Sequence, residues 1–114
     1  MGTALSEREC VPCQGGLAPL KGDALSPLSQ ELSGAWSVID EHHLHRVYIF
    51  KDFVDGLAFV NRVADIAENV NHHPDLHLSW GKVMIDIWTH KIDGLSESDF
   101  VLAAKIDRLM RLEP

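Results

Sequence analysis

Apolar and polar residues alternate in two neighbouring stretches of the chain, residues 36–40 and residues 44–50. Strict alternation is typical of β-strands that bury one side. The polar segment at residues 41–43 between them has the length of a hairpin connection. The pattern therefore predicts an antiparallel pair of strands.

The stretch from Asp52 to Val70 instead has apolar residues at steps of three and four, which is typical of a helix. Two interpretations are open: a helix buried deeply on all sides, or a helix that packs on its own sheet and also on another subunit. We favour the second, because a domain of this size has little material with which to bury a helix completely. The apolar positions form two stripes, Phe53, Leu57, Val60, Ala64 and Ala67 in one, and Phe59, Val63, Ile66 and Val70 in the other.

A second alternating pair follows, with strands predicted at residues 76–80 and 82–89 on either side of a tight Gly81-Lys82 connection. One further helix is expected before the first pair of strands, and another after the second pair. Ser26-Pro27 has the hydroxyl and proline of a helix start, which predicts a short helix to about Leu32. Residues 96–99 resemble a capping box, with Ser96 as the cap and Asp99 reaching back, and predict the start of the last helix.

The element order is helix, strand, strand, helix, strand, strand, helix. This order favours an α+β fold of two layers, a four-stranded antiparallel sheet with the helices packed on one face. We expect residues 1–22 to be an irregular leader and residues 23–114 to form a single domain. The alternation predicts that the helix-free face carries four large side chains, Tyr48, Phe50, Met84 and Trp88.

The charge balance limits the partners. With 17 acidic and 10 basic residues, the net charge is −7, and no stripe of Lys and Arg is present. Such a chain repels a phosphate backbone, so we expect no direct nucleic-acid binding. No apolar run has the length needed to cross a bilayer, and the first residues lack a secretory pattern, so we expect a cytoplasmic protein without membrane contact.

The two cysteines, Cys10 and Cys13, have the Cys-x-x-Cys spacing of a zinc half-site or a redox pair. A structural zinc site needs four ligands, and the chain has no second such pair. A redox pair usually opens a helix, whereas Gly15, Gly16 and Pro19 follow here. We therefore favour a structural or incidental role.

Seven histidines are present, and three of them follow elements that would place them at a rim. Proline restricts the residue before it to extended conformations, so Pro74 fixes the direction of His73 beside His72. His90 follows the last predicted strand, and Glu68 lies four residues before His72. Imidazoles titrate near neutrality and suit acid–base chemistry, although each of these residues could equally be a solvated or structural one.

Another group, His42, His43 and His45, is a weak metal-site candidate, because His43 and His45 would share a strand face. No nearby acidic residue or cysteine clearly completes a ligand shell. We therefore expect no metal site.

Considered together, the motifs between about Trp36 and about Leu109 resemble those of the pterin-4a-carbinolamine dehydratase family. His-His-Pro is weak evidence alone, but it becomes specific when Thr-His and Gly-Leu-Ser follow. The motifs are Phe50-Lys51-Asp52-Phe53, Ala67-Glu68, Asn71-His72-His73-Pro74-Asp75, Lys82-Val83, Thr89-His90 and Gly94-Leu95-Ser96.

The resemblance implies an enzyme that dehydrates 4a-hydroxytetrahydropterin to a quinonoid dihydropterin, recycling the pterin of aromatic amino-acid hydroxylases. It implies no cofactor, because the pterin is the substrate, and a homodimer joined at sheet edges or a homotetramer joined through the long helix. An aromatic amino-acid hydroxylase is a possible partner. The implied catalytic residues are His72, His73, His90 and Glu68, and the implied substrate contacts are Asn71, Pro74, Thr89 and Trp36.

Two positions depart from the family pattern: Asn71 stands where animal members have an aspartate, and Ser98 where many members have a basic residue. These departures bear on contacts to the substrate's tail more than on acid–base chemistry. The rival hypothesis is a non-catalytic relative, such as a dimerisation cofactor of a transcription factor or a Rubisco assembly chaperone. Retention of all three histidines favours the enzyme.

Overall fold

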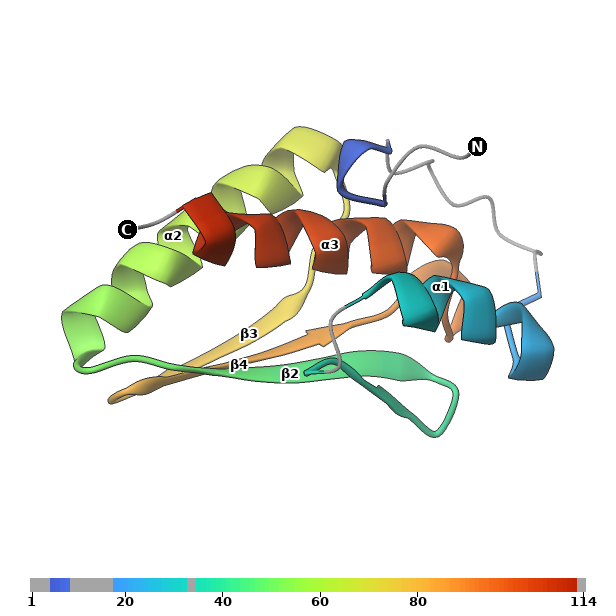
Figure 1. Cartoon of the computed structure of the whole chain (residues 1–114), viewed down its shortest axis with the longest axis horizontal. Coiled ribbons are helices and arrows are strands. Elements are labelled where there is room, and N and C mark those ends of the chain that lie inside the picture. The colour runs from blue at the N-terminus through green and yellow to red at the C-terminus, as the bar shows by residue number, and fades with distance from the viewer. Residues whose placement is uncertain (1–4, 9–17, 33–34, 113–114) are drawn as a thin grey trace.

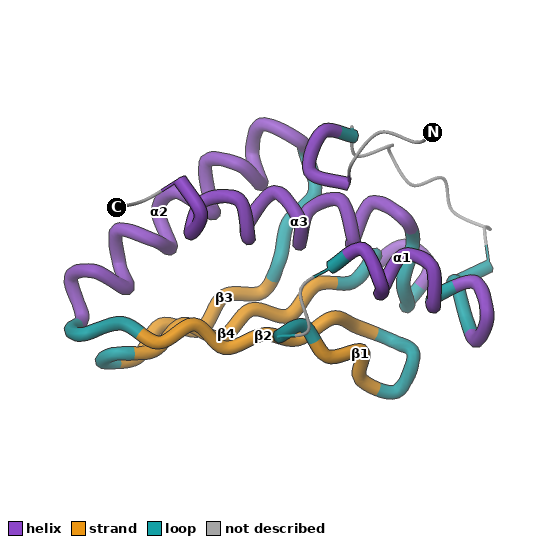
Figure 2. Tube along the Cα trace, in the orientation of Figure 1, coloured by secondary structure: helices purple, strands orange, loops and turns teal. Residues whose placement is uncertain are grey.

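The computed structural model of the chain describes residues 5–8, 18–32 and 35–112. Cys10 and Cys13 lie outside the described residues. Helices cover one face of a single sheet, as Figures 1 and 2 show. The elements in chain order are η1 (Leu5–Glu7), η2 (Gly22–Ala24), α1 (Ser26–Glu31), β1 (Ser37–Ile39), β2 (His43–Ile49), α2 (Phe53–Val70), β3 (Asp75–Ser79), β4 (Lys82–Ile87), η3 (His90–Ile92) and α3 (Glu97–Leu112).

All neighbouring strands in the sheet are antiparallel, in the order β1-β2-β4-β3. The α+β prediction is therefore confirmed. In β4 the buried side chains of Val83, Ile85 and Ile87 face the helices. Met84 and Trp88 have the opposite parity and lie on the helix-free face, as predicted.

The prediction for the neighbouring strand is wrong. Tyr48 is only 3% exposed and Ile49 is 73% exposed, so the face of Tyr48 is the buried one. The register explains this, because Tyr48 pairs with buried Val83, and side chains directly opposite one another share a face. Phe50 has the same parity and contacts Phe59 of α2, with ring centroids 5.2 Å apart. Both sides of β2 have large apolar residues, so alternation alone could not identify the inner one.

Helix α2 begins and ends at recognisable caps. The Asp52 side chain accepts a hydrogen bond of 2.9 Å from the backbone N–H of Asp55. The helix stops at Asn71, which adopts the left-handed conformation at φ 56°. This ending turns the chain sharply, and His72 follows directly.

The two apolar stripes of α2 have different surroundings. Phe59 and Val63 are buried against the sheet, whereas Phe53 and Leu57 are 43% and 41% exposed. One stripe therefore forms the core, and the other is only partly covered within the chain.

A buried polar cluster fixes the sheet to α3. The carboxylate of Asp107 accepts hydrogen bonds from Arg46 at 2.6 Å, from the indole N–H of Trp36 at 2.9 Å and from the hydroxyl of Tyr48. Burial, together with the hydrogen bond to Asp107, raises the pKa of Tyr48 far above its usual value. The Arg46 guanidinium also lies 4.2 Å from the centre of the Tyr48 ring.

The described residues before α1 contact the rest of the fold. Leu5 is 3% exposed within the core, and the backbone N–H of Leu20 donates to the carbonyl of Leu95 over 2.8 Å. A Cβ at Gly94 would lie 2.5 Å from the Cβ of Pro19, so glycine lets residues 19–20 approach the loop that follows His90. Over the described residues, no helix is both long and apolar enough to cross a membrane.

Candidate active site

A pocket of about 310 Å³ lies where the end of α2 meets the end of β4. Its volume is at the lower end of the range for small-molecule sites, roughly 300–1,000 Å³. Imidazoles stand on two walls that are distant in sequence. The lining residues are Asn71, His72, His73, Trp88, Thr89, His90 and Lys91.

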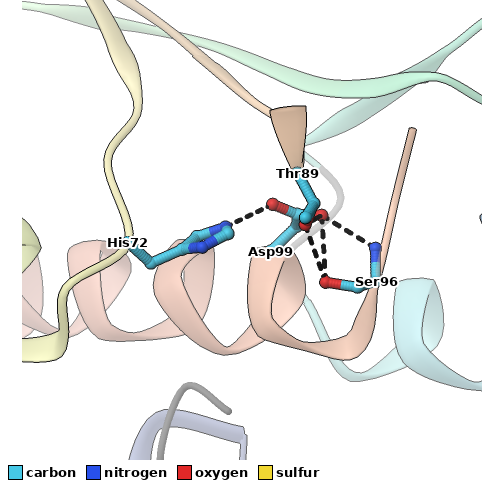
Figure 3. A network of polar contacts seen from close by, with 4 residues as sticks. All are labelled: His72, Thr89, Ser96 and Asp99. Carbon is cyan, nitrogen blue, oxygen red and sulfur yellow. Dashed lines mark hydrogen bonds and ion pairs between the residues drawn. The ribbon is translucent and has the colours of Figure 1, made fainter. Parts of the chain in front are cut away.

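The first wall is anchored by a buried carboxylate. Asp99 has no exposed surface, and its Oδ1 lies 2.6 Å from Nε2 of His72. Its Oδ2 accepts hydrogen bonds of 2.8 Å from the Thr89 hydroxyl and from the Ser96 backbone N–H. Figure 3 shows His72 and Thr89 approaching Asp99 from different elements. The predicted capping contact between Ser96 and Asp99 is therefore confirmed.

This arrangement determines the tautomer of His72. An ionised carboxylate can only accept hydrogen bonds, so the Nε2–H of His72 donates to Asp99. In the neutral ring, Nδ1 is then the proton acceptor, and it has no hydrogen-bond partner among the described residues. His72 is therefore suited to accept a proton at Nδ1.

His73 has a carboxylate partner of a different kind. Its Nε2 hydrogen-bonds to Oε2 of Glu68 in the last turn of α2, but both side chains are more than half exposed. Solvent screens such a pair, so its contribution to stability is small. In the structure, Glu68 therefore pairs with His73, and Asp99 pairs with His72.

His90 stands on the second wall at the start of η3, and it is exposed. Its ring centroid lies 4.4 Å from that of Trp88, with a tilt of 39° between the rings. The loop that contains His90 is closed by a backbone hydrogen bond of 2.8 Å, from the N–H of Thr89 to the carbonyl of Gly94. No carboxylate contacts the His90 ring among the described residues, so its environment differs from that of His72.

Five of the residues predicted from the sequence line this pocket. Glu68 does not line it but hydrogen-bonds to His73, which does. Trp36 lies elsewhere, buried in the core with its indole N–H bonded to Asp107. Pro74 follows His73 but is not part of the lining. The five are Asn71, His72, His73, Thr89 and His90.

Sequence reasoning missed the pairing of Asp99 with His72 and the presence of Trp88 and Lys91 in the wall. Asp99 was identified only as the residue that reaches back to the helix cap Ser96. A contact across 27 positions leaves no local pattern. Trp88 and Lys91 lie within two positions of His90 in the sequence, and this proximity could have indicated that they line the same pocket.

The weak metal-site candidate has carboxylate partners. Nδ1 of His45 and Nε2 of His43 lie 2.7 Å and 3.7 Å from Oδ1 of Asp86. In the part of the chain that the structure describes, no group of three or more His, Cys, Asp or Glu residues is placed to hold a metal ion.

Comparison with known proteins gives a consistent result. The family model for pterin 4 alpha carbinolamine dehydratase matches residues 18–109. A Rubrobacter xylanophilus protein with the provisional name pterin-4-alpha-carbinolamine dehydratase is 58% identical over 105 residues, which cover 92% of this chain and 97% of that protein. The mitochondrial pterin-4-alpha-carbinolamine dehydratase 2 of Arabidopsis thaliana is 47% identical over 110 residues, which cover 92% of this chain and 58% of that protein.

A solved structure agrees with the fold. The crystal structure of a transcriptional coactivator/pterin dehydratase from Brucella melitensis matches with a TM-score of 0.74 and 26% identity, covering 80% of this chain and 97% of that one. Because the family model and the similar relatives span most of its length, the chain belongs to the pterin-4-alpha-carbinolamine dehydratase family.

Proposed function

We propose that this chain dehydrates a 4a-hydroxytetrahydropterin to the quinonoid dihydropterin and water by histidine acid–base catalysis. The observation that carries the proposal is the pairing of His72 with buried Asp99 on one wall of the pocket that His90 lines from the other. Aromatic amino-acid hydroxylases form the hydroxylated pterin, so the reaction returns their cofactor to use.

The reaction requires two proton movements. The bond between ring carbon 4a and the hydroxyl oxygen breaks, and the oxygen leaves as water after receiving a proton. The neighbouring ring nitrogen loses its proton, and its electron pair forms the new carbon–nitrogen double bond. A general base and a general acid on opposite sides of the ring meet both requirements.

The different surroundings of His72 and His90 indicate which of them is the base and which is the acid. Nδ1 of His72 is the base, because Asp99 holds the opposite nitrogen and stabilises the imidazolium that forms. Protonated His90 is the acid that delivers a proton to the leaving oxygen. His73, oriented by Glu68, binds the ring or its hydroxyl.

Dehydration of a synthetic 4a-hydroxytetrahydropterin tests the proposal. We expect the wild-type chain to accelerate the reaction over buffer, and His90→Ala to lower kcat by about 10²–10⁴-fold, the usual contribution of a positioned acid or base. His77→Ala is the matched control, because His77 is an exposed histidine of β3 outside the pocket lining. A wild-type rate equal to that of buffer would instead favour a non-catalytic binding module.

We also propose that the chain self-associates through the partly exposed stripe of α2. Phe53 and Leu57 of this stripe are 43% and 41% exposed, and the adjacent Val54 is 69% exposed. Burying such an apolar patch is favourable. Leu57→Glu is therefore expected to give a smaller assembly in analytical ultracentrifugation, whereas Lys51→Glu, an exposed change just before the helix, is expected to leave the mass unchanged. Equal masses for the wild type and Leu57→Glu would contradict the interface.

A further inference from the structure

Thr89 is a buried residue at the end of β4 whose hydroxyl contacts the support of His72. The residue is 3% exposed, and its hydroxyl donates over 2.8 Å to Oδ2 of Asp99. Its backbone is fixed as well, because its N–H donates over 2.8 Å to the carbonyl of Gly94. The hydroxyl is therefore presented to Asp99 from a rigid part of the fold.

The hydrogen bonds around Asp99 determine where each hydroxyl proton points (Figure 3). An ionised carboxylate can only accept, so the proton of the Thr89 hydroxyl is directed at Asp99. The Ser96 hydroxyl lies 2.8 Å from the Thr89 oxygen but 3.5 Å from Oδ2 of Asp99, so it donates to Thr89. The one hydroxyl proton of Thr89 is thus used by the carboxylate and is not available to a ligand.

The Thr89 hydroxyl helps to fix the orientation of the carboxylate. Oδ2 of Asp99 accepts hydrogen bonds of 2.8 Å from two donors, the Thr89 hydroxyl and the Ser96 backbone N–H. The two donors belong to different segments of the chain, so together they restrict rotation of the carboxylate more than either does alone. Oδ1 is thereby directed at Nε2 of His72, which is 2.6 Å away.

We propose that Thr89 is a positioning residue that keeps the ring proton of His72 on Nε2 by holding Asp99 in place. The inference rests on the proposed function and adds to it, because Thr89 acts through Asp99 and not by a direct contact with the substrate. Without the hydroxyl, the carboxylate turns away from His72 in part of the molecules, and the neutral ring then populates both tautomers. Only the tautomer with the proton on Nε2 leaves Nδ1 free to act as the base.

The kinetic test removes the hydroxyl and keeps the branched shape of the side chain, in Thr89→Val. Because the Ser96 hydroxyl is near enough to Oδ2 to replace the lost donor, the double variant Thr89→Val, Ser96→Ala is the full test. We expect it to lower kcat by about 10–100-fold, the usual effect of losing a hydrogen bond to a charged group, with little change in KM. Thr89→Ser, which keeps the hydroxyl, is expected to retain most of the kcat.

A second comparison tests whether Thr89 acts through Asp99. Adding Thr89→Val and Ser96→Ala to Asp99→Asn is expected to lower kcat no further, because the base is already lost in that background. Losses that multiply would show that Thr89 acts independently of Asp99, and they would overturn the inference. A double variant with the kcat of the wild type would overturn it as well.

¹⁵N NMR of the His72 ring separates this inference from the proposed function. We expect the proton on Nε2 in the wild type and in Thr89→Ser, and a mixture of both tautomers in the double variant Thr89→Val, Ser96→Ala. This result supports the positioning role even if no dehydration is detected. A proton that stays on Nε2 in the double variant, with circular dichroism showing a folded chain, would overturn the role even if dehydration is fast. If the double variant does not fold, Thr89→Val alone is measured, and the same two outcomes decide.

Discussion

Asp99→Asn is expected to lower kcat for dehydration by about 10²–10⁴-fold in a chain that remains folded. Thr89 and Ser96 both donate to Oδ2, so they retain the amide oxygen at that position. The amide NH₂ then faces His72 and donates to Nε2, which transfers the ring proton to Nδ1. Nδ1 becomes a donor, and the base is lost.

Glu68→Gln is the matched control, because it makes the same chemical change at the exposed pair with His73. Water can replace the contacts of an exposed pair, so we expect kcat to fall by less than about tenfold. ¹⁵N NMR of the His72 ring reports the tautomer independently of activity. If Asp99→Asn keeps the wild-type kcat although NMR shows the changed tautomer, His72 is not the base.

Asp107→Ala is expected to lower the free energy of unfolding by about 3 kcal/mol, the lower end of the loss for a buried pair, because it removes the common acceptor of two buried donors and of a guanidinium that is only 20% exposed. Arg46, Tyr48 and Trp36 all donate to this carboxylate. A typical domain has only about 5–15 kcal/mol of stability, so the loss is a large fraction. Urea denaturation followed by circular dichroism measures it. A loss below about 1 kcal/mol would show that the cluster does not hold α3 to the sheet.

The same cluster makes stability depend on alkaline pH. Because the pKa of Tyr48 is raised in the folded chain, the neutral phenol is favoured there, and its contribution to stability is complete below the unfolded-state pKa. Above about pH 10 the unfolded state ionises first, and the contribution falls by about 1.4 kcal/mol per pH unit. Tyr48 is the one tyrosine in the chain, so phenolate absorbance in wild type is expected to rise only with unfolding, and Tyr48→Phe is expected to lack this part of the pH dependence.

Local patterns were sufficient for most of the fold. The capping box at residues 96–99 and the periodicity of residues 53–70 are properties of short segments, and the structure has helices where they indicate them. The inner face of β2 could not be predicted, because Tyr48 and Ile49 are both apolar and only the pairing with Val83 decides between them. Register is a property of two strands together.

The candidate site also has residues that local motifs predict and residues that only the tertiary structure brings together. The local motifs with His72, His73 and His90 were visible in the sequence, and the structure places all three in one pocket. The carboxylate that supports His72 was visible only as part of a capping box, because the packing of α3 against α2 brings Asp99 to His72. Trp36 was expected at the substrate, but its indole satisfies a buried carboxylate instead, and no feature near it in sequence shows that Asp107 would be there.

The most direct test is the dehydration rate of His72→Ala, His90→Ala and the double variant, measured on one synthetic carbinolamine substrate. If the two imidazoles act on the same ring, each single change lowers kcat by about 10²–10⁴-fold, and the double variant is far less impaired than the product of the two losses. Wild-type turnover in the double variant would show that catalysis occurs elsewhere or that this pocket is not an active site.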